Sequence, residues 1–358
     1  MSYPLSADRF VRLENTPDKE EPQELADLKR RNPLYISSRD AQVTLENKIS
    51  KITDRVYSLE LGRELIIGQI GGKFDALPRS TANDITVQES DPNIPDWSGI
   101  NYHPKLTSPM QFKTMRRVNG KRVIPHYIFG VDDRQVYYPS GYPWRCIGRI
   151  FVWTDPSAGW VWSGSGALVG RNVVLTSSHV CPWADTGSWM MKFVPAYYDG
   201  TSTSGSGVYS YVETYRGYEP HGQGDDIAIL KLYTPLGDAL GYFGAKTYND
   251  DWEDGNYWTK CGYPGAVSSG QRPSRITWFP IIDDDNDGAG VELEYHADGS
   301  GGDSGGPVFG WWNDLPYIIG AHSGGEEEYE FPFSIIKNNL SAGGSILPNL
   351  INWGRSNW

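Results

Sequence analysis

One serine of this chain stands where its hydroxyl could act as a nucleophile. Ser304 lies in the run GGDSGGP, which spans residues 301–307. Glycines on both sides permit a tight turn that exposes the serine and aims neighbouring backbone N–H groups at one point. Such N–H groups stabilise an oxyanion as it forms, and we assign the two donors to Gly302 and Ser304. The run therefore predicts a nucleophile beside its own oxyanion hole.

A histidine and an aspartate elsewhere in the chain could activate that serine. His179 ends the apolar run NVVLTSSH, and Asp226 directly precedes the apolar run IAILKL. An imidazole can take the proton of the hydroxyl, and a buried carboxylate can orient the imidazole. Each residue alone has an ordinary explanation in a core or a turn, but the combination in the order His, Asp, Ser is much harder to explain in that way. We predict that His179, Asp226 and Ser304 form a catalytic triad that hydrolyses amide bonds.

The sequence around these residues predicts strands that would position them. From residue 150 onward, short runs rich in β-branched and aromatic residues alternate with turns rich in Gly, Asp and Ser, which is typical of a barrel or sandwich of many strands. The 41 glycines, 24 prolines, 14 tryptophans and 22 tyrosines favour the same all-β class. After Ser345, Leu347, Leu350 and Ile351 fall on one helical face, so we also expect a short C-terminal helix.

The chain before residue 123 has a different texture. It opens with many charges, contains the segment PQELADLKRR that we expect to form a short helix, and then becomes rich in Pro, Asn and Asp. The pair Lys121-Arg122 is either a site where a processing enzyme cuts or an ordinary solvated basic turn. We therefore predict two parts, with residues 1–122 as a pro-segment or appended region and residues 123–358 as the domain that carries the triad.

Charge and hydropathy argue against several classes of function. A formal charge of -12 leaves no surplus of Lys and Arg to neutralise phosphates, so we expect no nucleic-acid partner. No run of about 18 apolar residues occurs, so we expect no membrane span, and residues 1–21 lack the apolar stretch of a secretion signal. The cysteines Cys146, Cys181 and Cys261 are too widely spaced for a zinc site. We expect no metal and no cofactor.

Several motifs resemble those of a known family. TSSHVC, DIAIL and GDSGGPV, around the three candidate residues, are similar to the corresponding segments of trypsin-like serine proteases. Within that superfamily the chain most resembles the glutamyl endopeptidases of bacteria and fungi, and the likeness covers about residues 123–358. The segments that carry it are FGVDDRQV at 129–136, YPWR at 142–145, GYFG at 241–244, GYPG at 262–265 and IGAHSGG at 319–325.

The resemblance implies a fold, a mechanism and a setting. The fold would be a double antiparallel β-barrel with the triad in the cleft between the barrels. His179 would be the general base and then the general acid, Asp226 the carboxylate that orients it, and Ser304 the nucleophile that forms an acyl-enzyme. The protein would be a secreted monomer that acts on polypeptide substrates.

The chain departs from many members of the superfamily in one disulfide. Val180 follows the histidine where those members have a cysteine, and Gly164 occupies the position of the partner cysteine. That disulfide is therefore absent. Cys181 could pair with Cys146 instead, or all the thiols could simply be buried.

The residues that would determine which bond is cleaved indicate different specificities. His322 matches the histidine with which glutamyl endopeptidases bind a substrate carboxylate, whereas Asp298 stands where trypsin-like enzymes place the aspartate that pairs with Lys or Arg. Backbone groups of Ser323 and Gly325 would pair with an extended substrate. The acidic run 326–328 either disfavours acidic substrates at the pocket rim or is a solvated turn. We predict cleavage after Glu or Asp, with cleavage after Lys or Arg as the alternative, and a core histidine as the ordinary explanation of His322.

Asp303 suggests a mode of activation. In trypsin-like zymogens, a freed N-terminal ammonium pairs with the aspartate before the nucleophile and organises the oxyanion hole. Asp303 holds that position here. We hypothesise that cleavage after Arg122 supplies such an ammonium.

Three further patterns point to other functions. Residues 283–294 fit the calcium loop of an EF-hand, but the strand-like sequences on both sides favour an Asp-rich β-hairpin turn, and a calcium site within that turn stays an alternative. Asn339-Leu340-Ser341 matches a glycosylation sequon. A protein of the same fold could also bind extended peptides without cutting them, although such a protein would need neither the triad nor the glycines of the oxyanion hole.

Overall fold

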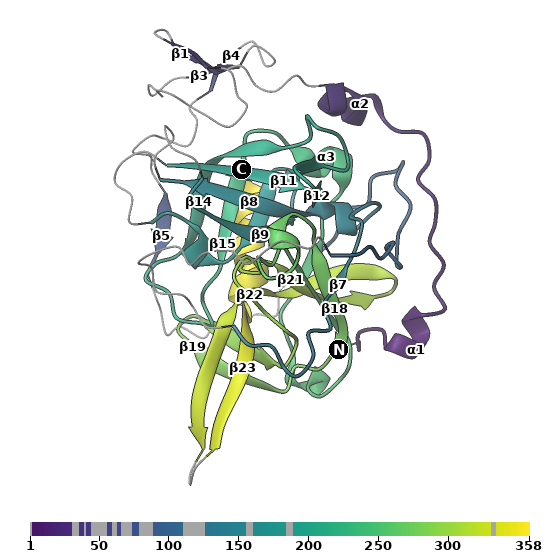
Figure 1. Cartoon of the computed structure of the whole chain (residues 1–358), viewed down its shortest axis with the longest axis vertical. Helices are drawn as coiled ribbons and strands as arrows, with labels where there is room; N and C mark the ends of the chain where they lie inside the picture. The colour runs from purple at the N-terminus through teal and green to yellow at the C-terminus, as the bar shows by residue number, and fades with distance from the viewer. Residues whose placement is uncertain are drawn as a thin grey trace.

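The computed structural model describes residues 2–30, 36–38, 41–43, 56–58, 63–65, 74–78, 89–109, 126–154, 160–183, 189–330 and 334–358. Two antiparallel sheets dominate this part of the chain, and its helices are few and short (Figure 1). The strand-rich region begins near residue 135, where the sequence becomes rich in β-branched and aromatic runs.

The first sheet closes into a barrel. Six strands pair in the order β11-β8-β9-β10-β15-β14, and β11 also pairs with β14, which closes the ring. Apolar side chains fill the interior, since Ile150, Val152, Ala167 and Leu175 are completely buried. The strands are β8 (Ile147–Trp153), β9 (Trp162–Leu168), β10 (Val173–Thr176), β11 (Met190–Pro195), β14 (Ser210–Tyr218) and β15 (Ala228–Leu232).

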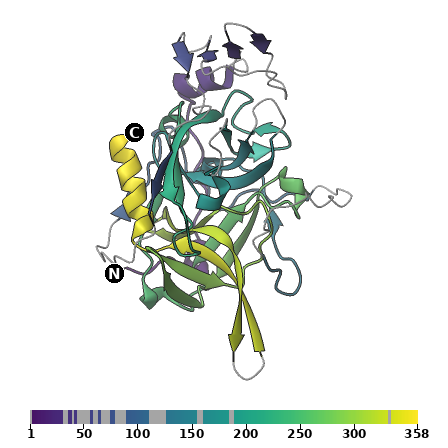
Figure 2. The same cartoon turned by 90° about the vertical axis from the view of Figure 1, so that its left-hand side faces the viewer.

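The second sheet pairs in the order β19-β20-β23-β22-β21-β17-β18-β7, with β16 beside β22. An aromatic cluster that includes Trp252, Trp258 and Trp312 fills its core. β22 and β23 continue beyond the body as a long hairpin (Figures 1 and 2). The strands are β7 (Gln135–Val136), β16 (Gly244–Lys246), β17 (Trp258–Gly262), β18 (Ser274–Phe279), β19 (Asp283–Asp287), β20 (Gly290–Tyr295), β21 (Pro307–Trp312), β22 (Leu315–Glu330) and β23 (Ser334–Gly343).

The described chain ends in α4 (Ile346–Asn357), as predicted. Leu347, Leu350 and Ile351 form its buried face. Gly354 allows close approach to the first barrel, because a Cβ there would lie 2.7 Å from Ile229 Cδ1. The predicted all-β class with a short C-terminal helix is confirmed. The remaining short elements are α3 (Leu236–Leu240), β12 (Tyr197–Tyr198), β13 (Thr201–Ser202) and the 3₁₀ turns η1 (Trp144–Cys146), η2 (Ser178–Val180), η3 (Asp250–Trp252) and η4 (Ser268–Gly270).

Residues 2–30 run along the outside of the two sheets (purple in Figure 1). The Leu5 N–H donates to the Trp311 carbonyl over 2.7 Å, and Phe10 packs against the same tryptophan ring. Asp18 forms an ion pair with Arg145 at 3.0 Å. This strap begins with α1 (Ala7–Phe10) and ends with α2 (Gln23–Arg30), which is the helix that the sequence predicts.

Other N-terminal segments extend the two sheets. β5 (Asp75–Leu77) pairs with β14 in parallel, and β6 (Glu89–Ser90) pairs with β16. A separate small sheet holds β1 (Ile36–Ser38), β2 (Ala41–Val43), β3 (Val56–Ser58) and β4 (Arg63–Leu65). Much of the described N-terminal region is therefore packed against the two sheets. The division into residues 1–122 and 123–358 stays a prediction, and Lys121-Arg122 lies outside the described residues.

Three side predictions can be compared with the fold. Cys146, Cys181 and Cys261 are all free and buried, so the alternative pairing of Cys146 with Cys181 is wrong. The EF-hand pattern forms the hairpin β19–β20, in which Asp287 pairs with Gly290, as the strand-like neighbours indicate. The acidic run 326–328 belongs to β22 and is not a turn. Among the described residues, no helix is long and apolar enough to cross a membrane.

Candidate active site

Paired strand ends bring His179 and Asp226 together. β10 and β15 are antiparallel neighbours, with Thr176 opposite Ala228, so the residues just beyond these ends lie side by side. The Asp226 carboxylate accepts from the His179 ring at Nδ1 over 2.6 Å and from the His179 backbone N–H over 2.9 Å. These two contacts fix both the ring and its backbone. They leave Nε2 as the ring nitrogen available for proton transfer.

Asp226 is completely buried and has further polar partners. The Ser323 hydroxyl donates to Oδ2 over 2.6 Å, and His221 Nδ1 lies 3.6 Å from Oδ1. Burial by itself raises the pKa of Asp226, but the imidazoles of His179 and His221 and the Ser323 hydroxyl outweigh burial and hold the pKa below its ordinary value. The carboxylate therefore stays ionised at neutral pH.

Ser304 lies in a turn that only glycines can flank in this form. Gly302 and Gly305 have φ values of 104° and 81°, a region that side-chain-bearing residues rarely adopt. Asp303 N–H and Gly305 N–H donate to the carbonyls of Ser300 and His322. Within the described part of the chain, the N–H groups of Gly302 and Ser304 have no such internal acceptor. These two donors are therefore free to bind an oxyanion.

Gly164 lies where its strand packs against both the Ser304 turn and Val180, the residue after His179. A Cβ at this position would lie 2.8 Å from a Val180 methyl carbon and 3.0 Å from the Ser304 carbonyl oxygen. The neighbouring Ser165 N–H donates to the Ser304 carbonyl over 2.7 Å. The strand therefore contacts the Ser304 turn and the residue after His179 at one point. Glycine is required there, which accounts physically for the missing disulfide cysteine.

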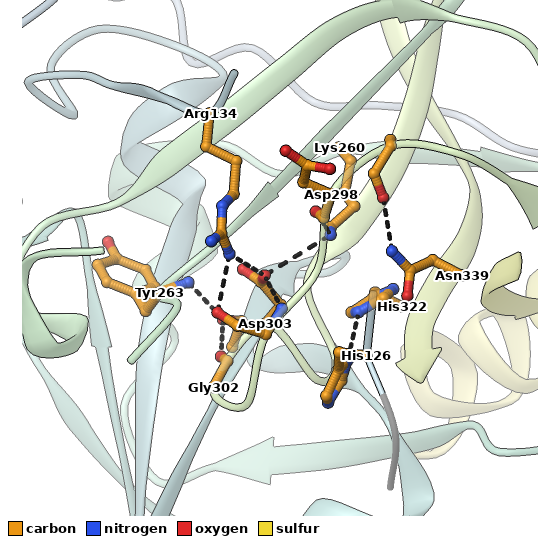
Figure 3. A network of polar contacts seen from close by, with 12 residues as sticks. His126, Arg134, Lys260, Tyr263, Asp298, Gly302, Asp303, His322 and Asn339 are labelled. Atoms are coloured by element: carbon orange, nitrogen blue, oxygen red, sulfur yellow. Dashed lines mark hydrogen bonds and ion pairs between the residues drawn. The ribbon is translucent and has the colours of Figure 1, made fainter. Parts of the chain in front are cut away.

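His322 is part of a buried polar chain, and Figure 3 shows its contact with His126. Its Nδ1 is 2.7 Å from the Tyr295 hydroxyl, which also contacts the Ser341 hydroxyl at 2.7 Å. Its Nε2 is 3.2 Å from His126 Nδ1. Burial lowers the pKa of His322 well below its ordinary value, and burial together with nearby Lys260 lowers the pKa of His126 to about 3. Both imidazoles are therefore neutral at neutral pH.

The chain from residue 126 crosses the loop that precedes Ser304. Tyr127 N–H donates to Asn339 Oδ1 over 2.9 Å, and the Tyr127 carbonyl accepts from Gly299 N–H over 2.9 Å. A Cβ at Gly325 would lie 2.9 Å from both the Tyr127 ring and Asn339 Oδ1. Asn339 is itself completely buried. The sequon is therefore a structural amide in this fold and cannot carry a glycan.

Asp298 is buried and uses its carboxylate inside the protein. Oδ1 accepts from Phe129 N–H over 2.7 Å, and Oδ2 accepts from Asp133 N–H over 3.2 Å. Only 2% of the residue is exposed. This carboxylate holds the 126–134 segment against the loop, a function that the position of Asp298 in the sequence does not reveal.

Sequence reasoning missed five residues of this network, and their signals were weak. Arg134 lies in the segment FGVDDRQV, but an arginine beside two aspartates is also what a solvated turn would contain. Lys260 occupies the middle of an ordinary strand. The others are His126, Tyr295 and Asn339, each far in sequence from the residue it contacts.

Comparisons with known proteins agree with this geometry. Residues 157–333 match the Trypsin family. A glutamyl endopeptidase of Bacillus licheniformis is 26% identical over 281 residues, which cover 69% of this chain and 82% of that protein. Exfoliative toxin A of Staphylococcus aureus is 31% identical over 150 residues, 39% of this chain and 49% of the toxin. A solved structure of a Glu endopeptidase in complex with MPD superposes with a TM-score of 0.50 at 18% identity, over 64% of this chain and all of that chain.

Fold, site geometry and relatives together define the class of this protein. It belongs to the trypsin/chymotrypsin-like serine proteases and is a serine endopeptidase. Within that superfamily it lies close to the glutamyl endopeptidases.

Proposed function

We propose that the protein cuts polypeptides with Ser304, His179 and Asp226 as its triad. The observation that carries this proposal is the double contact of the buried Asp226 carboxylate with His179. His179 Nε2 takes the proton of Ser304 Oγ as the oxygen attacks the carbonyl carbon, and the N–H groups of Gly302 and Ser304 bind the oxyanion. The amine then leaves with the proton from His179. Water, activated by His179, hydrolyses the acyl-enzyme.

The cleaved bond follows Glu, or Glu and Asp, in this proposal. The polar chain supports it, because one arrangement of its protons delivers a donor to a substrate carboxylate. If the Tyr295 hydroxyl donates to His322 Nδ1 in place of the Leu340 carbonyl, then His322 Nε2–H donates to His126 Nδ1, and the proton of His126 is left on Nε2. Neutral imidazoles can thus still bind an anion. Asp298 is a poor competing site for Lys or Arg, since it is only 2% exposed and its carboxylate already accepts from two backbone N–H groups.

Digestion of a mixed peptide library tests the proposal directly. Cleavage sites are read by mass spectrometry for the wild type and for Ser304→Ala. Cuts after Glu that vanish in the variant are the expected result. Cuts after Lys or Arg would move the specificity role to Asp298, and no cleavage, even after removal of residues 1–122, would favour a peptide-binding protein. Secretion and a monomeric state stay predictions.

His322→Leu is expected to lower kcat/KM about 10- to 100-fold for a peptide with Glu before the cut, because His126 loses the partner at Nδ1 that holds its proton on Nε2 for the substrate carboxylate. A matched peptide with Leu at that position should be cut at an unchanged rate. Tyr295 keeps its contacts with Leu340 and Ser341, so the variant should fold. His103→Leu, which replaces an exposed histidine elsewhere, is the control. Equal losses for both peptides would contradict a role in specificity.

The variant Asp298→Asn distinguishes specificity for Glu from specificity for Lys or Arg. We expect the preference for Glu to persist, and the free energy of unfolding to fall by about 1.5–3 kcal/mol, because a buried carboxylate that accepts from Phe129 and Asp133 becomes an amide. Denaturant unfolding and the peptide library measure the two quantities. A large loss of cleavage after Lys or Arg would instead support the trypsin-like alternative.

A further inference from the structure

Asp303, the residue before the nucleophile, is buried and sits inside the oxyanion loop. Only 1% of it is exposed. Its Oδ2 accepts from Ser300 N–H over 3.1 Å, while its backbone N–H donates to the Ser300 carbonyl. Asp303 thus closes the short turn that carries Gly302. A buried carboxylate at this place needs a cation, because an unpaired charge in a protein interior is costly.

Two internal cations meet this carboxylate (Figure 3). Arg134 Nη1 lies 3.5 Å from Asp303 Oδ2, and Lys260 Nζ lies 3.6 Å from the same oxygen. The side chains of both cations are only 2% and 3% exposed. Solvent therefore screens these pairs weakly, and both charges act on the same end of the loop.

Each cation also holds a second point of the loop. Arg134 Nη1 donates to the Ser300 hydroxyl over 2.8 Å. Arg134 Nε and Nη2 donate to the Asp132 carboxylate over 2.9 and 2.7 Å, which fixes the orientation of the guanidinium group. Lys260 Nζ donates to the Asp298 carbonyl. The two cations therefore connect Asp298, Ser300 and Asp303, which lie on both sides of the glycines that shape the turn.

The charge states favour Arg134 as the firmer partner. Burial by itself lowers the pKa of Arg134, but its bond with Asp132 and the nearby Asp303 raise the pKa above its ordinary value. Burial lowers the pKa of Lys260, and Asp303 only partly opposes this. Arg134 is thus permanently charged, and it provides the variant to test.

We infer that Arg134 and Lys260 are positioning residues that organise the oxyanion hole through Asp303, so that the hole forms without an ammonium from a newly cut chain end. This inference rests on the proposed function. It replaces our hypothesis that a cut after Arg122 provides the counter-charge. The described segment from residue 126 to Arg134 is continuous and already delivers its cation to the loop.

The first experiment uses the full chain with Arg122→Ala, shown to be uncut by intact-mass measurement. A small alkyl fluorophosphonate reports on the oxyanion hole without filling the specificity pocket. Ser304 Oγ forms a bond to phosphorus, fluoride leaves, and the hydroxyl proton passes to His179. We expect the uncut variant to be labelled at a rate within about threefold of the rate for protein that has been cut after Arg122. A rate at least 100-fold slower would overturn the inference in favour of a chain-end ammonium.

The second experiment tests the cation. Arg134→Met is expected to slow phosphonate labelling and lower kcat about 100-fold, the size of effect seen when one oxyanion donor is lost, with KM nearly unchanged. Arg134→Lys should restore part of the rate, which a purely structural loss would not predict. Arg272→Met removes an arginine that pairs with Asp199 elsewhere and serves as the matched control.

The outcomes separate the inference from the proposed function. A folded Arg134→Met protein labelled at the wild-type rate would overturn the inference alone. If Arg134→Met does not fold, Arg134→Lys and Lys260→Met are compared by the same rate, and wild-type labelling of both overturns it as well. A wild-type protein, cut or uncut, that is never labelled at Ser304 overturns the proposed function itself.

Discussion

Ser304→Ala is expected to lower kcat about 10⁶-fold, the size of loss observed when the nucleophile of such a triad is removed. Without the hydroxyl no acyl-enzyme can form. The His179 to Asp226 contact and the N–H groups of Gly302 and residue 304 remain, so binding of peptides should persist. Cleavage of a peptide with Glu before the scissile bond, followed by mass spectrometry over days, measures the remaining rate.

The matched control for this variant is Ser140→Ala, which replaces an exposed serine that is far from Ser304 in the sequence. We expect that variant to keep wild-type kcat. Circular dichroism should show both variants folded. If Ser304→Ala kept more than a few per cent of the wild-type rate, and phosphonate labelling excluded contamination by wild-type enzyme, another residue would have to be the nucleophile.

The sequence could predict the parts of the site that depend on local order along the chain. Ser304 has its glycines as neighbours, and His179 and Asp226 stand at the ends of apolar runs that are long enough to be strands. Antiparallel pairing of two such strands then brings their ends together. The all-β class follows from the same runs, because alternating burial on short strands needs two packed sheets or a barrel.

Contacts that cross the fold could not be predicted in this way. His126 and His322 are 196 residues apart in the chain, and Arg134 and Asp303 are 169 apart. Nothing in the local sequence of Lys260 distinguishes it from a lysine on the open face of a strand. Asp298 is the instructive case, because its partners are backbone N–H groups, which every residue except proline carries and no motif records.

The nearly complete burial of these charges also explains why net charge says little about the site. The chain carries a formal charge of -12, yet the loop beside Ser304 is organised by two cations. Arg134 and Lys260 act at short range in a poorly solvated interior, whereas charges that are exposed to solvent are screened. Local pairing therefore decides how an anionic transition state is accommodated here, and the net charge governs only longer-range steering.

Asp226→Asn is expected to lower kcat about 10⁴-fold while leaving Ser304 and the oxyanion donors in place. The amide can accept from the His179 backbone N–H, but its NH₂ group then faces His179 Nδ1. That contact favours the tautomer with the proton on Nε2, and this nitrogen can no longer take the proton of Ser304. Steady-state kcat, measured beside melting temperature, separates this effect from unfolding.

Asp225→Asn is the matched control for that variant. Asp225 is equally buried and accepts from the N–H groups of Gly222 and Ala289, and neither of these two contacts involves His179. Its replacement should lower stability and leave kcat near the wild-type value. If Asp226→Asn stayed within tenfold of wild-type kcat, the imidazole would have to be oriented by another group.

The same variant has a defined pH dependence of stability. The pKa of Asp226 in the folded protein lies below its ordinary value of 3.8, so the ionised carboxylate stabilises the fold at every pH above about 4. This contribution is lost as the pH falls through the pKa of the folded protein. The difference in the free energy of unfolding between wild type and Asp226→Asn should therefore be largest near neutral pH and shrink below pH 4. A difference that grew toward acid pH would mean that burial, which raises the pKa, outweighs the contacts with His179, His221 and Ser323.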